Sequence, residues 1–237
     1  MSDSPAYRGL GDIIVTARPF DEYLAMFDLS PSDLLAGPVL DCPAGASGFA
    51  AGARALGADV TSADPAYAEP HAGLVDRARA DTAFGNRYVA EHPDVYEWGF
   101  FRDLPDHLSR RMAAVEAFDA DRTAHPGRYV AAALPHLPFG DGTFHLVVSS
   151  HLLFVYPDHF TYADHLAGLR EFIRVTAPGG EVRVFPLVDT TTEPYPDLPR
   201  LMNDLAADGI TAQVRRVPYE FIRRGTEMLV LRRTIPA

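Results

Sequence analysis

The sequence is poor in cysteine, in long apolar runs and in clustered basic residues. Its one cysteine, Cys42, excludes an internal disulfide. No apolar run reaches the roughly 18 residues that a membrane span needs, and no charged and apolar leader segment is visible. We therefore expect a soluble, cytoplasmic protein that has no membrane partner.

The charge balance limits the possible substrates. The formal net charge is −11 at pH 7, and the arginines form no block. A nucleic-acid partner requires a basic face that neutralises phosphates, so we expect none. The 237 residues, 47% of them hydrophobic, suffice for one sizeable core with or without a cap.

The nine histidines do not form a metal-binding pattern. Neither H-E-x-x-H nor a paired Cys/His spacing occurs, and His151, His159 and His165 include no helical i, i+4 pair. We predict no metal site. Cys42 lies within an apolar run and is expected to be a small buried hydrophobic residue rather than a nucleophile.

Residues 38–64 have the pattern of a strand–helix–strand unit. "GPVLDCP" predicts a buried strand, "GFAAGARALGA" a helix of small residues, and "DVTSAD" a second strand. This alternation is typical of a parallel sheet. Further strands are predicted near 128–132 and 144–149, and a helix that ends at "APGG" precedes another strand.

The turn after the first strand suits a ribose-containing cofactor. Its small residues let a ligand approach the backbone. Asp64 stands 19 residues after Gly45, where an acid can accept hydrogen bonds from two ribose hydroxyls. The turn lacks the three glycines of a dinucleotide site, and Pro43 has no N–H for a phosphate. A cofactor without phosphate is favoured, while a tight turn without any ligand stays open as the alternative.

Four segments, in order, resemble the motifs of the class I S-adenosylmethionine-dependent methyltransferases. They are "VLDCPAGASGFA", "VTSADP", "LPHLPFGDGTFHLVVSSHLLFVY" and "LREFIRVTAPGGEVRVF". The resemblance covers most of the chain from residue 38 onward. It implies an α/β fold: a Rossmann-like, doubly wound, mostly parallel sheet with a helical cap, whose last strand, near 226–233, is inserted antiparallel.

The resemblance also implies a division of the chain into three parts. Residues 1–37 are expected to form an N-terminal helical lid. Residues 38–64 and 128–237 are expected to form the S-adenosylmethionine-binding α/β domain. Residues 65–127 are expected to be a helical insertion that forms a cap or substrate region. The aromatic residues of this insertion either line a substrate pocket or form its own small core: Tyr88, Tyr96, Trp98, Phe100 and Phe101.

The cofactor implied by the resemblance is S-adenosylmethionine. In such proteins Asp41 would orient the cofactor's amino group or the turn, and Asp64 would hold the ribose. Pro43 and Ser47 stand where the family usually has glycine. The adenine would be bound by backbone groups and apolar packing, since no acid is present for its amino group. The expected cofactor-binding residues are Asp41, Pro43, Ala44, Gly45, Asp64, Ala133, Leu134, Ser149 and, at the methionine carboxylate, Arg18.

Catalytic roles are predicted for His151, Ser150 and Tyr23. The first two follow the strand at 144–149, at the sheet edge where open α/β folds bind ligands. With an ordinary pKa near 6.5, His151 is suited to act as a general base, the alternative being a role in ordering its loop. Tyr23 lies in the expected lid helix, where its ring would either face the sulfonium or pack on the sheet.

The leading functional hypothesis is methyl transfer from S-adenosylmethionine to a small molecule by SN2 displacement, in a monomer or homodimer. One alternative keeps the cofactor but not the methyl transfer, as in intramolecular cyclisation to azetidine-2-carboxylate with release of methylthioadenosine. A second alternative is a non-catalytic S-adenosylmethionine-binding protein. The products formed by the purified protein distinguish these three hypotheses.

Overall fold

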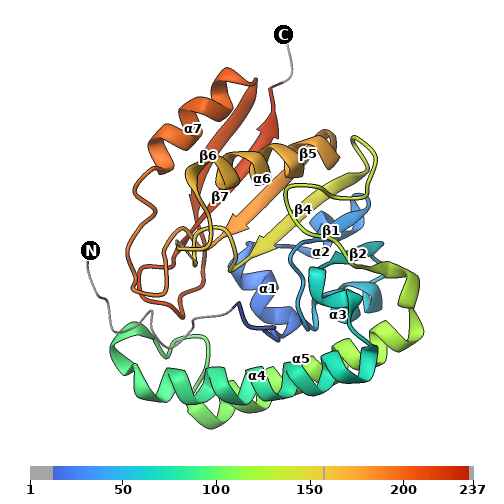
Figure 1. The fold of residues 1–237 in the computed structure, drawn as a ribbon, viewed down its shortest axis with the longest axis vertical. Helices are drawn as coiled ribbons and strands as arrows, with labels where there is room; N and C mark the ends of the chain where they lie inside the picture. The colour runs from blue at the N-terminus through green and yellow to red at the C-terminus, as the bar shows by residue number, and fades with distance from the viewer. Residues whose placement is uncertain (1–12, 157, 235–237) are drawn as a thin grey trace.

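The computed structural model describes residues 13–156 and 158–234. Within these residues one seven-stranded sheet has the order β3-β2-β1-β4-β5-β7-β6 (Figure 1). The strands are β1 (Val39–Asp41), β2 (Val60–Ala63), β3 (Tyr129–Val130), β4 (Phe144–Ser150), β5 (Thr176–Phe185), β6 (Ile210–Arg216) and β7 (Glu227–Arg233).

The strand pairing confirms the predicted fold class. Strands β1 to β5 pair in parallel, whereas β7 runs antiparallel to both β5 and β6. Strand β1 pairs with β2 on one side and with β4 on the other, so the strand order reverses between β1 and β4. Such a reversal leaves a crevice at the carboxyl ends of the strands, where open α/β sheets bind ligands.

Helices cover both faces of the sheet. Neighbouring residues of one strand enter different cores, as the two-residue period of a strand requires: Val39 and Val148 pack in one core, Leu40 and Val147 in the other. The helices are α1 (Phe20–Met26), α2 (Pro31–Leu35), α3 (Phe49–Ala55), α4 (His71–Glu91), α5 (Leu104–Ala124), α6 (Tyr162–Val175) and α7 (Leu198–Ala207).

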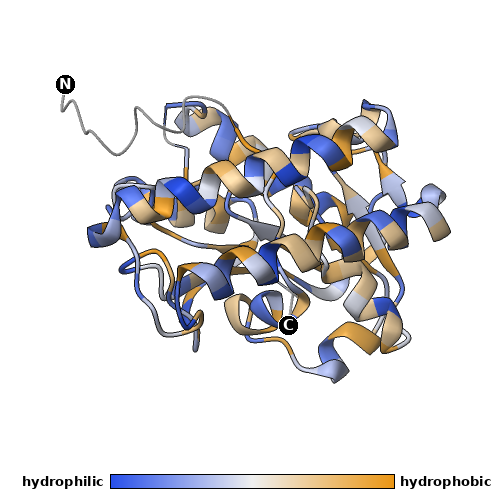
Figure 2. Cartoon of the chain, turned by 90° about the horizontal axis from the view of Figure 1, so that it is seen from below, coloured by the Kyte–Doolittle hydropathy of each residue, from blue (hydrophilic) through white to orange (hydrophobic). Residues whose placement is uncertain are grey.

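Helices α4 and α5 form a long pair at one end of the sheet (Figure 1). Hydrophilic and hydrophobic residues are mixed along these helices, as expected where one helix face is buried (Figure 2). The loop between them is joined to the loop before β7 by a bridge between Tyr96 and Ile222. The Glu97 N–H donates to the Phe221 carbonyl at 2.8 Å. The α4–α5 pair is therefore connected to the loop between β6 and β7, at one edge of the sheet.

Helix α1 is part of the core. Met26 and Phe27 are fully buried, and the Tyr23 ring stacks on Phe49 with ring centroids 4.6 Å apart. Gly52 permits the close approach of α1 to α3, since a Cβ there would lie 2.3 Å from the Phe20 ring. Burial of each large apolar side chain contributes about 1.5–3 kcal/mol. Opening of the whole helix as a lid would lose these contributions, and the lid role of residues 1–37 stays a prediction.

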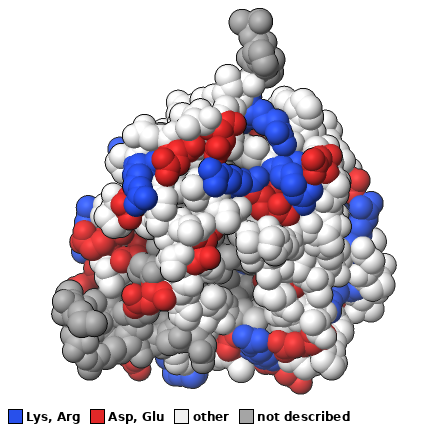
Figure 3. Space-filling view, turned by 45° about the horizontal axis from the view of Figure 1, so that its top comes forward, with Lys and Arg blue, Asp and Glu red and all other residues white. Residues whose placement is uncertain are grey.

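The described surface carries many charged side chains of both signs. Acidic and basic side chains lie next to one another on the face shown in Figure 3. Exposed pairs such as Arg170 with Asp208, 2.7 Å apart, hold arginines at the surface. Of the helices in the described ranges, none is both long and apolar enough to span a bilayer.

Candidate functional site

Two cavities meet at the carboxyl ends of the central strands. The large cavity, about 460 Å³, lies over the turn after β1 and is also lined by residues that follow β2, β3 and β4. The small cavity, about 100 Å³, lies between the segment 14–18, the helices α4 and α5 and the loop before β7. Four residues line both cavities: Ile14, Thr16, His151 and Tyr156.

Asp64 lies on the wall of the large cavity, directly after β2. Its Oδ2 accepts a hydrogen bond from the Gly45 N–H and its Oδ1 from the Ala66 N–H, both at 2.9 Å. Burial raises the pKa of the carboxyl, although the two N–H donors favour its ionised form. Each carboxylate oxygen can accept a further hydrogen bond, so Asp64 remains able to bind ligand hydroxyls.

The turn after β1 depends on Gly45. Its φ is +54°, and a Cβ there would lie 2.7 Å from the Thr16 carbonyl oxygen. Its own carbonyl accepts a hydrogen bond from the Tyr67 hydroxyl at 2.8 Å. Pro43 and Gly45 both line the large cavity, whereas the predicted neighbour Ala44 is buried and does not.

Asp41 lies beneath this turn and not in a cavity wall. It is fully buried and accepts hydrogen bonds from the Tyr23 hydroxyl at 3.3 Å and from the Ser47 hydroxyl at 3.2 Å. Burial raises the pKa of the Asp41 carboxyl well above its usual range. Asp41, Tyr23 and Ser47 are absent from the lining residues of both cavities. Ser47, at a position usually held by glycine, thus supplies a partner for the buried acid.

The remaining wall of the large cavity is largely apolar. Ala133 and Leu134, both predicted site residues, lie there with Leu152 and Phe160. Cys42 also lines it, and burial raises the pKa of its thiol well above the usual range. The thiol is therefore neutral, in keeping with the small hydrophobic residue that the sequence predicts.

The end of β4 carries Ser149, Ser150 and His151. Ser149 is fully buried, belongs to neither cavity wall, and its hydroxyl has no hydrogen-bond partner among the residues described. Ser150 lines the large cavity, and its Oγ lies 2.8 Å from His151 Nδ1. His151 has a φ of +50°. Such a conformation costs a non-glycine residue on the order of 1 kcal/mol and is typical of functional sites.

The electrostatic surroundings of His151 differ from those assumed for it from the sequence. Burial, together with the positive charges of Arg18 and Arg111, lowers the pKa of His151 well below 6.5. The ordinary pKa expected for this residue from the sequence is therefore wrong. At neutral pH the imidazole is uncharged, with one N–H donor and one acceptor nitrogen.

Arg18 belongs to a buried ionic network at the small cavity. Arg18, Arg111 and the Tyr219 hydroxyl all donate to Oε1 of Glu22, at 2.8, 2.9 and 2.6 Å. Arg18 and Arg111 line the small cavity, and neither lines the large one. The role predicted for Arg18 at the methionine carboxylate stays a prediction, and the structure places this residue next to the shared wall.

A neutral histidine extends this network. The Arg111 Nε donates to His107 Nε2 at 3.1 Å, and Asn86 lies 2.9 Å from Nδ1 of the same ring. Burial and the neighbouring arginines lower the pKa of His107 to about 2. His107 and Arg111 were not predicted from the sequence. No sequence pattern marks Arg111, because its burial on the face of α5 that also carries Val115 is seen only in the folded chain.

The aromatic residues of the insertion have different surroundings. Tyr88 and Tyr96 line the small cavity, whereas Trp98 is 39% exposed. Phe101 is fully buried and packs on Phe221, with ring centroids 5.0 Å apart. Part of the set thus lines a cavity, whereas Phe101 belongs to the main core and not to a separate core of residues 65–127. That the cavity binds a substrate stays a prediction. Within the described ranges no three His, Cys, Asp or Glu side chains gather into a possible metal site.

The strand order, the antiparallel β7 and the acid after β2 together define a class I methyltransferase fold. Residues 107–184 match the family model of a methyltransferase domain. This part of the chain is therefore similar to a methyltransferase domain. A curated relative, an uncharacterized protein of Methanocaldococcus jannaschii, is 25% identical over 228 residues, which is 96% of this chain and 99% of the relative.

Similar solved structures have low sequence identity. A putative S-adenosylmethionine-dependent methyltransferase of Methanococcus maripaludis is 12% identical, with a TM-score of 0.49 over 99% of this chain and 88% of the other. A TehB-like methyltransferase of Corynebacterium glutamicum is 13% identical, with a TM-score of 0.46 over 96% and 94%. The 1,6-didemethyltoxoflavin-N1-methyltransferase of Burkholderia thailandensis is 19% identical, with a TM-score of 0.45 over 89% and 77%.

Proposed function

We propose that this chain is an enzyme that transfers the methyl group of S-adenosylmethionine to a small molecule by SN2 displacement. The observation that carries the proposal is the junction of the two cavities at His151, Thr16 and Ile14. A cofactor in the large cavity and an acceptor in the small one would meet at this junction. Such positioning is the main contribution that a protein makes to a displacement reaction.

The residues of the large cavity fit S-adenosylmethionine. Asp64 can accept hydrogen bonds from the ribose hydroxyls, and the apolar wall at Ala133 and Leu134 suits a flat adenine. Two acids, Asp64 and Glu69, line this cavity, and its one arginine, Arg77, pairs with Glu69 at 2.6 Å. These acids, together with a Pro43 that offers no N–H, disfavour a phosphate-bearing cofactor. The volume of the large cavity lies in the usual range for cofactor sites.

When bound, S-adenosylmethionine supplies a methyl group on a positively charged sulfur. The chain's own contribution is to orient the acceptor, exclude water and accept a proton. The Nδ1 of His151 faces Ser150, so Nε2 is the ring atom left for an acceptor. Because its pKa is lowered, His151 is an uncharged but weak base over the whole neutral range.

Product analysis tests this proposal. The purified protein is incubated with S-adenosylmethionine, alone and with a chemically varied panel of small molecules as candidate acceptors. Methyl transfer leaves S-adenosylhomocysteine, whereas cyclisation of the cofactor releases methylthioadenosine without any acceptor. Acceptor-dependent S-adenosylhomocysteine supports the proposal. Methylthioadenosine as the main product, or binding without turnover with every acceptor, contradicts it. The cytoplasmic location and the monomeric or homodimeric state remain predictions.

A further inference from the structure

The small cavity contains buried polar groups that the protein itself leaves unpaired. Within the described part of the chain, Arg18 Nε, Thr82 Oγ1 and Thr190 Oγ1 have no hydrogen-bond partner. All three residues line the small cavity, and they are 8%, 7% and 4% exposed. Leaving a buried donor or acceptor without a partner is costly, so these groups point to a ligand that supplies the missing bonds.

The charge of the small cavity is unbalanced. Two guanidinium groups, of Arg18 and Arg111, share the single carboxylate of Glu22, and they do so through one of its oxygens. The lowered pKa values of His107 and His151 show that both rings are uncharged at neutral pH. The buried cluster therefore carries one net positive charge in a region of low dielectric, where a counter-ion is strongly favoured.

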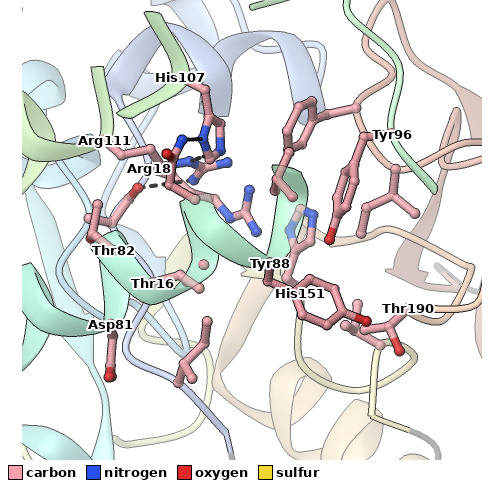
Figure 4. Close-up of a pocket in the computed structure, with 18 of the residues that line it drawn as sticks. Thr16, Arg18, Asp81, Thr82, Tyr88, Tyr96, His107, Arg111, His151 and Thr190 are labelled. Atoms are coloured by element: carbon pink, nitrogen blue, oxygen red, sulfur yellow. Dashed lines mark hydrogen bonds between the residues drawn. The ribbon is translucent and has the colours of Figure 1, made fainter. Parts of the chain in front are cut away.

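The acid that also lines this cavity does not neutralise the cluster. Asp81 Oδ2 accepts a hydrogen bond from the Val15 N–H at 2.9 Å and lies 3.5 Å from Arg77. Figure 4 shows Arg18, Arg111 and His107 gathered at one end of the cavity, with Asp81 apart from them. Thr190 lies across the cavity from the arginines in the same view. The positive charge is thus confined to one end.

We propose that the small cavity is the acceptor pocket, and that the methyl acceptor is a small molecule whose carboxylate binds to Arg18. This inference rests on the proposed function and adds the chemical class of its substrate. Thr82 and Thr190 offer hydroxyls to other polar atoms of the acceptor. The rest of the wall, with Val89, Phe221 and Ile222, suits an apolar body. Charge-assisted hydrogen bonds between guanidinium and carboxylate are among the strongest in proteins.

The preference of the small cavity for a carboxylate is tested by comparing carboxylic acids with their own amides. Acetate, butanoate and benzoate are each titrated, by ligand-observed NMR, into the protein saturated with S-adenosylhomocysteine, in parallel with acetamide, butanamide and benzamide. We expect at least one acid to bind about tenfold more tightly than its amide, because the neutral amide cannot form the charge-assisted hydrogen bonds that a carboxylate forms with Arg18. No binding of any acid, or equal binding of each acid and its amide, would overturn the proposal.

Three variants test whether Arg18 causes the preference for the acid over the amide. Arg18→Gln should abolish it, and Glu22→Gln, which keeps both arginines and removes the negative charge, should strengthen it. Arg102→Gln is the matched control, because its side chain is 84% exposed and lies outside both cavity walls. An unchanged preference in a folded Arg18→Gln protein would contradict the proposal. If that variant does not fold, an unchanged preference in Glu22→Gln would contradict the proposal instead.

The amino-acid part of the cofactor is the other source of a carboxylate. The contribution of this carboxylate to cofactor binding is measured by comparing the affinities of S-adenosylhomocysteine and of methylthioadenosine, which lacks the carboxylate. If Arg18 serves the acceptor, Arg18→Gln leaves both affinities within a few-fold of the parent. A selective loss for S-adenosylhomocysteine assigns Arg18 to the cofactor and overturns the proposal. Binding of an acid in preference to its amide, together with methylthioadenosine as the main product of the incubation with S-adenosylmethionine, would instead refute methyl transfer and leave the pocket in place.

Discussion

Gly45 lies so close to Thr16 that a Cβ at position 45 would be 2.7 Å from the Thr16 carbonyl oxygen. The backbone φ of +54° adds a second reason for glycine at this position. This contact joins the turn after β1 to the extended segment 14–18, whose residues Ile14 and Thr16 line both cavities. The glycine is thus required by the protein's own backbone as well as by its place in the wall of the large cavity.

Replacement of this glycine should therefore cost stability. Gly45→Ala is expected to lower the free energy of unfolding by about 1–3 kcal/mol, because it combines an unfavourable φ with a clash against backbone. Gly73→Ala is the control, since Gly73 lies in α4 with nothing within 4 Å of its Cβ position, and it should raise stability by up to about 1 kcal/mol. Urea denaturation measures both. Equal effects would contradict this account of the turn.

Asp64 is predicted to hold the ribose. Asp64→Asn should weaken S-adenosylhomocysteine binding by about 1.5–3 kcal/mol, the value of hydrogen bonds to a charged group. Glu69→Gln is a matched control, as Glu69 lines the same cavity but pairs with Arg77. Calorimetric titration gives the two dissociation constants. An unchanged constant for Asp64→Asn would make this acid a turn residue only.

The burial of Asp41 predicts a pH dependence of stability. Because its pKa is raised in the folded protein, the ionised form is disfavoured there. The stability that this group contributes is present below its unfolded pKa of about 3.9 and is lost as pH rises through the folded value. Asp41→Asn should therefore gain stability relative to the parent as pH increases from about 4. Denaturation across pH 4–8 tests this, and parallel curves for the two proteins would refute it.

His151 should matter more for turnover than for cofactor affinity. Asn tolerates a positive φ, so His151→Asn removes the imidazole while keeping the backbone conformation. We expect turnover to fall by at least about tenfold, with the cofactor dissociation constant within a few-fold, because His151 lies at the junction of the two cavities, where it would position the acceptor. In the parent, turnover should show no titration near pH 6.5, since the pKa of His151 lies well below it. Parallel losses in turnover, affinity and melting temperature would make the residue structural.

Cofactor binding should order the extended segment rather than α1. Val15 and Thr16 lie in that segment, and Thr16 lines both cavities. In contrast, Tyr23 and Met26 of α1 are already buried in the core. Hydrogen exchange with and without S-adenosylhomocysteine should show new protection at residues 13–17 and little change at 20–26. New protection confined to α1 would support the lid role predicted for that helix from the sequence.

The sequence predicted the parts of this protein that depend on local pattern. The strand–helix–strand unit placed Asp64 next to Gly45, and the resemblance gave the antiparallel last strand. The ionic network could not be predicted in this way, because Glu22 meets Arg111 and Tyr219 only through packing of segments far apart in the chain. The lowered pKa of His151 has the same origin, since Arg18 approaches it from another segment.

The replacement of family glycines is likewise explained only in three dimensions. The sequence suggests that small residues suffice for the turn. The structure shows in addition that the Ser47 hydroxyl donates to the buried Asp41 carboxyl. A serine at this position therefore satisfies a buried acid, a role that spacing alone could not reveal.

Calorimetric titration of the parent protein with S-adenosylhomocysteine tests the central claim most directly. The account predicts binding at one site per chain, and the same titration of Asp64→Asn should show the weaker affinity given above. The absence of both binding heat and a thermal shift, in protein shown to be folded by circular dichroism, would contradict the assignment of the large cavity to S-adenosylmethionine.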